Sequence, residues 1–288
     1  MLNIKKILVP IDFPNPSLSV IHQAATLARR FHSEILMLHI VTPASRKAGM
    51  PEEGPELTRW DMRAEIIKAD LNQTLARELD GLTIQCVLAK GNPALAIVRT
   101  AQQEKADLIM MPSRGHTFNE FLLGSVTAIV TQGAECPVWT GAHVDELPVQ
   151  KFAIRNVLCA VNFRAHSNKT ASWAEQVAAE FGARLTLADV TAPVEFWGAG
   201  GSYVNLKWKA ALVADASQHI AKVQRGIGIK ADIFIGSGDV PKVLSQAAKQ
   251  TRADLLVTGC RPYGGHLRTH GYSIIRELPI PVLSVGGP

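Results

Sequence analysis

Apolar residues follow two alternating patterns along the first half of the chain. Short runs rich in β-branched residues, such as Ile7-Leu8-Val9, are typical of buried strands. They predict strands at 5–11, 35–41, 82–89, 107–111 and 137–140. Apolar residues at helical spacing predict helices at 17–32, 56–79, 92–104 and 124–133. This alternation favours an α/β fold with parallel strands, right-handed crossovers and helices on both faces, which is a Rossmann-like doubly wound sheet.

The same pattern then occurs a second time. The segment Ile7–Phe13 returns 150 positions later as Val157–Phe163, and Ala106–Met110 returns as 253–257. Strands are accordingly predicted at 155–161, 184–190, 229–235, 254–258 and 281–285. We therefore expect two tandem domains, 1–143 and 152–288, joined by a short linker at 144–151. Each is expected to contain a five-stranded parallel sheet.

The composition is that of an ordinary soluble globular protein. Hydrophobic residues make up 47% of the 288 residues and charged residues 19%. The sequence contains neither a signal-peptide pattern nor a run of about 18 apolar residues, so a cytoplasmic protein without membrane contact is expected. The four cysteines form no CxxC pair and are interpreted as reduced packing residues.

Charge is distributed unequally between the two halves. Residues 1–150 contain 14 basic and 16 acidic side chains, a net charge of −2, whereas residues 151–288 contain 16 and 9, a net charge of +7. A basic half can attract nucleic acid. However, its lysines and arginines are scattered and no aromatic residues are interleaved with them. A solvated surface is therefore favoured over a nucleic-acid site.

The segment after the fourth predicted strand carries the candidate chemistry. Gly124 and Ser125 stand at a predicted helix start, where unpaired N–H groups form a natural anion site suited to phosphate. Gly115 would let the preceding loop fold over the same place. From spacing alone, a plain helix cap explains Gly124 and Ser125 equally well, so both interpretations stay open.

Over its whole length the chain resembles the universal stress protein family in its tandem two-domain form. The resemblance rests on Ile7–Asp12, Gly91-Asn92-Pro93, Ala106-Asp107, and above all on Phe121–Val126 followed by Cys136-Pro137-Val138. It implies ATP as the ligand, with magnesium as an optional companion. The implied adenine and ribose contacts are Pro10, Ile11, Asp12, Ile40 and Met111. The implied phosphate contacts are Gly115, Gly124, Ser125 and Val126.

Two departures from the family pattern affect this site. Pro112 stands where the first glycine of the phosphate loop is expected, so that position has no N–H to donate. Only eight residues, one fewer than in the pattern, separate Gly115 from Gly124. Binding in the first domain is still favoured.

The second copy departs further. Asn162 replaces Asp12, and Arg268-Thr269 stand where Gly124-Ser125 are expected. An arginine side chain would occupy the place where the backbone must meet phosphate. We therefore expect ATP in the first domain only, with a degenerate site in the second.

The favoured function is a non-catalytic stress protein that binds adenine nucleotide and acts through unknown protein partners. The alternative is an interaction module that binds no nucleotide. An enzyme is disfavoured, beyond weak ATP hydrolysis, because no GxGxxG follows either first strand. His39 and Asp189 are interpreted as buried, hydrogen-bonded groups rather than catalysts, and His116 as either an anion contact or a solvent-facing loop residue. No metal site is predicted.

The resemblance also has a consequence for assembly. Family members commonly pair through their last strand, and here 137–140 and 281–285 can pair within one chain. Such pairing covers strand edges that would otherwise promote aggregation. It predicts an intramolecular pseudo-dimer, with a homodimer of chains as a further option.

Overall fold

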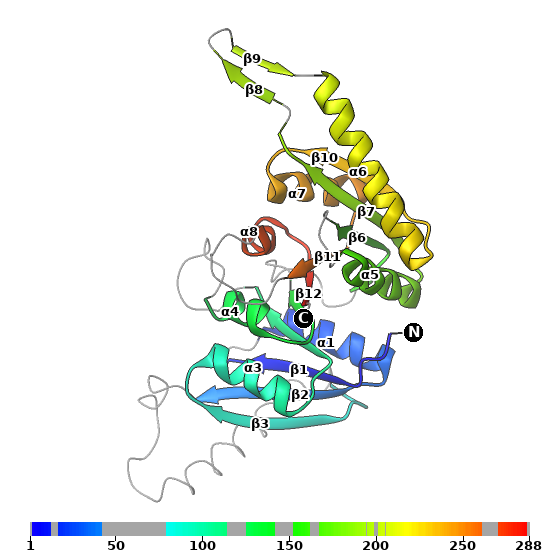
Figure 1. The fold of residues 1–288 in the computed structure, drawn as a ribbon. Helices are drawn as coiled ribbons and strands as arrows, with labels where there is room; N and C mark the ends of the chain where they lie inside the picture. Colours follow the sequence, from blue (N-terminus) through cyan, green and yellow to red (C-terminus); the bar gives the residue numbers. More distant parts are fainter. Residues whose placement is uncertain are drawn as a thin grey trace, which may run out of the picture. The chain divides into compact units, whose positions relative to one another are not determined.

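The computed structural model describes residues 2–12, 17–41, 79–113, 125–141, 152–161, 167–193, 195–198, 201–204, 206–260 and 270–286. The chain separates into two compact units, Asn3–Phe152 and Ala153–Pro288, the latter together with the first two residues. Figure 1 shows both units, which are described separately below. The predicted linker at 144–151 lies outside the described residues. The domain boundaries and the pairing of the last strands stay predictions.

The N-terminal unit follows the predicted alternation of strands and helices. Its described elements are β1 (Lys6–Ile11), α1 (Leu18–Phe31), β2 (Glu34–Val41), β3 (Ile84–Lys90), α3 (Pro93–Gln103), β4 (Leu108–Pro112), α4 (Ser125–Gly133) and β5 (Val138–Gly141). The strands are parallel in the order β3-β2-β1-β4-β5. Each lies within two residues of its predicted bounds at either end. The predicted helix at 56–79 lies almost wholly outside the described residues.

The C-terminal unit repeats this arrangement. Its elements are β6 (Asn156–Ala160), α5 (Ser167–Phe181), β7 (Arg184–Thr191), β8 (Glu195–Gly198), β9 (Gly201–Val204), α6 (Leu206–Ile227), β10 (Asp232–Ser237), α7 (Val240–Thr251), β11 (Leu255–Cys260), α8 (His270–Glu277) and β12 (Val282–Gly286). The parallel order β10-β7-β6-β11-β12 matches that of the first unit strand for strand.

Helices cover both faces of each sheet, which explains the continuous apolar runs of the central strands. Ile7, Leu8 and Val9 of β1 are all at most 1% exposed. A strand buried on both faces cannot alternate apolar and polar residues, because either face would then place polar groups in the core. In both units the two helices of the second half pack together, α3 with α4 and α7 with α8.

The helices α3 and α7 begin in the same way in both copies. The Asn92 side chain accepts a hydrogen bond from the Leu95 N–H at 3.2 Å, and Asp239 accepts one from the Lys242 N–H at 3.3 Å. A glycine with positive φ precedes each cap, Gly91 at 113° and Gly238 at 128°. Asn92-Pro93 and Asp239-Val240 differ in sequence, but the two helices are capped in the same way.

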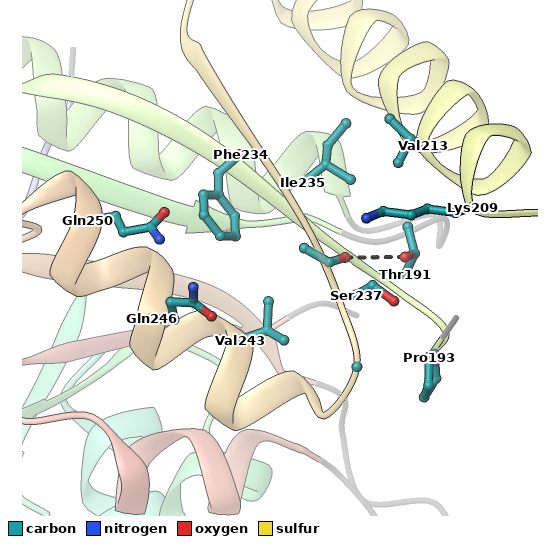
Figure 2. Close-up of a pocket in the computed structure, with 12 residues that line it drawn as sticks. Thr191, Pro193, Lys209, Val213, Phe234, Ile235, Ser237, Val243, Gln246 and Gln250 are labelled. Carbon is teal, nitrogen blue, oxygen red and sulfur yellow. Dashed lines mark hydrogen bonds between the residues drawn. The ribbon is translucent and has the colours of Figure 1, made fainter. Parts of the chain in front are cut away.

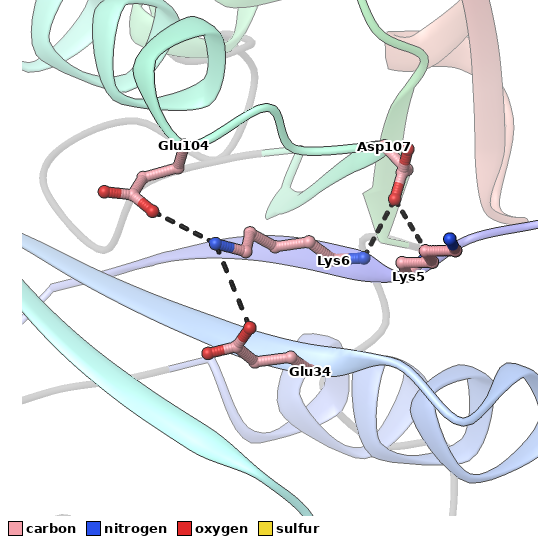
Figure 3. A network of polar contacts seen from close by, with 5 residues as sticks. All are labelled: Lys5, Lys6, Glu34, Glu104 and Asp107. Carbon is pink, nitrogen blue, oxygen red and sulfur yellow. Dashed lines mark hydrogen bonds and ion pairs between the residues drawn. The ribbon is translucent and has the colours of Figure 1, made fainter.

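A carboxylate fastens the amino ends of the central strands in each unit. Asp107 Oδ2 accepts hydrogen bonds from the N–H groups of Lys5 and Lys6 at 2.7 and 2.9 Å (Figure 3). Asp254 accepts the same two bonds from Arg155 and Asn156, again at 2.7 and 2.9 Å. These bonds explain why an aspartate precedes the fourth strand in both copies. The pair of bonds lies at the edge of the sheet opposite the strands' carboxyl ends.

Lys6 adds an ion network to this amino edge in the first unit. Its ammonium group lies 3.0 Å from Glu104 Oε2 and 3.9 Å from Glu34 Oε2 (Figure 3). The second copy has Asn156 in place of Lys6, and its amide donates to the Arg252 carbonyl at 3.1 Å. The charge network is thus particular to the first unit, whereas the paired N–H contacts are common to both.

The C-terminal unit also contains an antiparallel hairpin that the sequence patterns did not predict. In this hairpin Gly198 of β8 pairs with Gly201 of β9. The period-2 pattern is too short in four-residue strands to be recognised.

Candidate functional site

The strand order reverses direction at β1 in the N-terminal unit. From β1 the chain crosses first to β2 on one side, and β4 lies on the other side. Ligands of doubly wound sheets bind beyond the carboxyl ends of the strands at this reversal. Pro10 and Ile11 are the last residues of β1, and Asp12 follows them as an exposed residue.

The neighbouring strands bring two more of the predicted residues to this edge. Ile11 of β1 is in register with His39 of β2, so Ile40 lies one residue further toward the carboxyl edge. Met111 is the penultimate residue of β4, which pairs with β1 on its other side. The structure therefore gathers Pro10, Ile11, Asp12, Ile40 and Met111 at one edge of the sheet, although they are far apart in sequence.

This edge has an apolar wall that is continuous with the core. Ile40 and Val126 are partly buried and pack against a hydrophobic cluster that includes Met111. Met111 is only 4% exposed, so a ligand would meet mainly its backbone. Ile40 and Val126 keep accessible apolar surface, which suits contact with a flat aromatic ring.

Helix α4 begins beside this wall. Ser125 is its first residue, whereas Gly115 and Gly124 lie outside the described residues. Thr127, in the first turn, is 3% exposed and donates a hydrogen bond from Oγ1 to the Pro112 carbonyl at 3.1 Å. This bond ties the helix start to the end of β4. Because the first N–H groups of a helix have no partners within it, the start of α4 is held where it can receive an anion.

Thr127 was not predicted from the sequence as a site residue. A threonine two residues after a predicted helix start is an ordinary feature, and nothing local marks it as special. Its role depends on the Pro112 carbonyl, 15 positions earlier. Pro112 itself was noticed only for its missing N–H; the structure shows that its carbonyl holds the helix.

His39 has the structural role that was predicted for it. The side chain is 4% exposed, and Nδ1 lies 3.1 Å from the Ile11 carbonyl oxygen. Because a carbonyl can only accept, Nδ1 carries the proton and donates it. This bond fixes the carboxyl end of β1 to β2, and it thereby positions the peptide that leads into Asp12.

The equivalent position in the second unit is built differently. Asp189 is 2% exposed, and its Oδ2 lies 3.0 Å from Nδ1 of His219 on α6. Burial raises the pKa of the Asp189 carboxyl, and the hydrogen bond and charge of His219 oppose that rise. The prediction that Asp189 is a buried, hydrogen-bonded group is confirmed. Whereas His39 holds the end of β1, Asp189 holds helix α6 against the sheet.

Reactive groups are few among the described residues. Burial raises the pKa of the Cys136 thiol to about 11 and raises that of Cys159 as well, so both remain protonated at neutral pH. The described ranges contain no group of three or more His, Cys, Asp or Glu side chains able to hold a metal ion. Within those ranges, no helix has the length and apolar character needed to cross a membrane. His116 lies outside the described residues.

Comparison with known proteins identifies a family that matches both halves of the chain. The model of the universal stress protein family matches residues 3–140 and, a second time, residues 153–286. The chain belongs to the universal stress protein family. The predicted tandem form is thereby confirmed, as is the Rossmann-like α/β fold class.

Two relatives found by sequence each match about half of the chain, whereas a solved structure covers nearly all of it. A universal stress protein of Methanocaldococcus jannaschii is 34% identical over 140 residues, which are 46% of this chain and 79% of the relative. The protein YxiE of Bacillus subtilis is 30% identical over 141 residues, or 46% of this chain and 95% of the relative. A crystal structure of a universal stress protein from Archaeoglobus fulgidus covers 98% of both chains, with a TM-score of 0.70 and 21% identity. At that identity the structural match supports the fold alone.

Proposed function

We propose that this universal stress protein binds ATP in its N-terminal unit and acts through protein partners. One observation carries the proposal. The switch point of the first sheet gathers Pro10, Ile11, Asp12, Ile40 and Met111 beside a helix start that Thr127 anchors to β4. These are the positions that the family pattern assigns to adenine, ribose and phosphate.

The described residues suit the three parts of an adenine nucleotide. Ile40 and Val126 offer partly buried apolar surface for the base. The exposed carboxylate of Asp12 can accept hydrogen bonds from ribose hydroxyls or approach a magnesium ion held by the phosphates. The start of α4 supplies N–H donors for a phosphate group, and Gly115, Gly124 and Ser125 are proposed to complete this contact.

We propose binding rather than catalysis. Two buried polar side chains at this edge, His39 and Thr127, donate to the main-chain carbonyls of Ile11 and Pro112. Groups used in this way position the backbone and are poorly placed to move a substrate proton. Slow hydrolysis of bound ATP is the most that we expect. Nucleotide occupancy would then act as a signal read by partners.

The proposed site is restricted to the N-terminal unit. In the second copy Asn162 cannot supply the charge of Asp12, and Arg268 stands at the position of Gly124. A long side chain there would fill the space in which phosphate approaches the backbone. One ATP per chain is therefore expected.

Isothermal calorimetry on wild type and two reciprocal variants tests the proposal. Gly124→Arg copies the second unit's residue into the first and is expected to abolish binding, because a loss of several kcal/mol exceeds what a micromolar ligand can spare. The matched variant Arg268→Gly should bind ATP as wild type does. Two equivalent sites per chain, or undiminished binding by Gly124→Arg, would contradict the assignment. No binding by wild type would favour the alternative, an interaction module without nucleotide.

A further inference from the structure

The C-terminal unit has a groove along the edge of its sheet that no part of the proposed nucleotide site uses. The groove has a volume of about 550 Å³, within the range of protein ligand sites. Its floor is the edge strand β10, which pairs with β7 on one side and with no described strand on the other. Its walls are α6, which contributes Lys209 and Val213, and α7, which contributes Gln246 and Gln250 (Figure 2).

The backbone of β10 offers hydrogen-bonding groups to this groove. The Gly238 N–H donates to the Thr191 carbonyl of β7 at 3.1 Å, and the Thr191 hydroxyl donates to the Gly236 carbonyl at 3.2 Å (Figure 2). Even-numbered residues of β10 therefore direct their N–H and C=O groups toward β7. Because this direction alternates along a strand, the main-chain groups of Ile233, Ile235 and Ser237 point to the open edge.

The side chains of β10 divide between the two walls. A Cβ on Gly236 would overlap Val243 of α7, so the even-numbered positions, including Phe234, face α7. Ile235 then faces α6, near Lys209 and Val213. An extended chain laid against β10 would meet the same alternation, since its successive side chains also point to opposite faces. The two walls of the groove, α6 and α7, can therefore receive the alternate side chains of a bound strand.

The charge of the groove indicates what kind of strand would bind there. Lys209 is the charged side chain among the described residues that line the groove, and Figure 2 shows its ammonium end directed over the strand. It belongs to the half of the chain with a net charge of +7. A second copy of β10 would bring a second Lys209 to the same groove, which disfavours self-pairing.

We propose that the β10 edge is a docking site for an acidic, extended segment of a partner protein. The segment adds a strand to the sheet, with an acidic side chain toward Lys209 and the alternate side chains toward Phe234, Gln246 and Gln250. Main-chain bonds to Ile233, Ile235 and Ser237 hold the strand, and Lys209 selects its charge. This inference does not rest on nucleotide binding.

Fluorescence polarisation with a labelled, end-capped peptide of six alternating Glu and Val residues tests the proposal. The peptide is expected to bind the full chain at low salt at least about tenfold more tightly than its Lys-Val counterpart. Lys209→Glu should weaken binding by about tenfold, whereas Lys222→Glu, an exposed lysine of the same helix outside the groove, should not.

Two N-methylated peptides test strand pairing without altering the protein. One carries the methyl groups on the valines and the other on the glutamates. Only the series whose N–H groups face β10 should lose affinity, by about tenfold. Hydrogen exchange should also slow at the amides of Ile235 and Ser237 when the parent peptide is bound.

Several results would overturn the proposal. These are no binding of the Glu-Val peptide, equal binding of the Lys-Val peptide, equal effects of Lys209→Glu and Lys222→Glu, or parent-like binding by both N-methylated series. The measurements are made without nucleotide and repeated with Gly124→Arg. A failure of the ATP site would leave the peptide result unchanged, so the two proposals can fail separately.

Discussion

Removing the carboxylate that fastens the amino ends of the central strands should cost the same in both units. Asp107→Ala deletes an acceptor of two N–H groups at 2.7 and 2.9 Å, and Asp254→Ala deletes the same pair in the second unit. Hydrogen bonds to a charged group contribute about 1.5–3 kcal/mol each. One N–H of each pair is exposed and can bond to water instead, which lowers its share.

We therefore expect each alanine variant to lose about 2–3 kcal/mol of unfolding free energy in its own unit. Asp→Asn should lose only about 1 kcal/mol at each position, because the amide oxygen still accepts both bonds without the charge. Urea unfolding followed by a probe in each unit measures this, since two domains need not unfold together. Variants that keep a single tryptophan, Trp139 in the first unit or Trp173 in the second, provide these probes.

The losses of unfolding free energy in the two units can be compared directly, which tests this prediction. Losses below about 0.5 kcal/mol would show that water replaces both bonds at no cost. A loss in one unit more than about twice that in the other would show that the shared geometry does not set the energy. Lys6→Met serves as a control, because it removes the ion network of the first unit and keeps both N–H donors. It should cost less than about 1 kcal/mol.

Three further predictions concern other parts of the fold. Thr127→Val removes the bond to the Pro112 carbonyl at nearly constant volume; we expect about 1 kcal/mol lower stability by urea unfolding and weaker ATP binding by calorimetry, with unchanged affinity contradicting its positioning role. Gly236→Ala would drive a methyl group into Val243 and should cost about 1–3 kcal/mol of stability. Gly271→Ala, in a helix with open space around this position, should instead stabilise by about 0.5–1 kcal/mol. Equal melting temperatures of the two variants would refute this. Asp189 has a raised pKa in the folded state, so its contribution to stability is fully present at low pH and is lost as pH rises through the folded pKa. The unfolding free energy of wild type minus that of Asp189→Asn should fall as the pH rises above about 4, the ordinary pKa of an aspartate, with Asp215→Asn as the exposed control and a flat difference as the contrary result.

The sequence by itself determined the fold class and the repeat. A strand such as β1 is buried on both faces, so its central residues Ile7, Leu8 and Val9 are apolar without interruption, and a helix such as α1 keeps most of its apolar residues on one side. These requirements act locally and leave a direct record in the order of residues. The second copy strengthened that record, because the aspartates before β4 and β11 each accept hydrogen bonds from two N–H groups at the corresponding strand start.

The sequence also predicted that the candidate residues share one edge of the sheet. Parallel strands share one carboxyl edge, so Asp12 after β1, Ile40 in β2 and Met111 in β4 were expected to converge there, and the structure brings them to it. What local pattern could not supply was the set of contacts that hold this edge. Thr127 lies 15 positions from Pro112 and His39 lies 28 positions from Ile11, so these pairs meet only when the chain has folded.

The groove beside β10 likewise depends on contacts that the sequence pattern does not reveal. Lys209, Phe234 and Gln246 come from a helix, a strand and another helix, and no spacing in the sequence links them. Whether a strand lies at the edge of a sheet depends on the order in which strands pair, which follows from crossovers and not from the strand's own residues. Local residue patterns therefore decided which elements form. Only the tertiary structure decided which of their polar groups are satisfied within the unit and which remain at an open edge, because that depends on contacts between segments far apart in the chain.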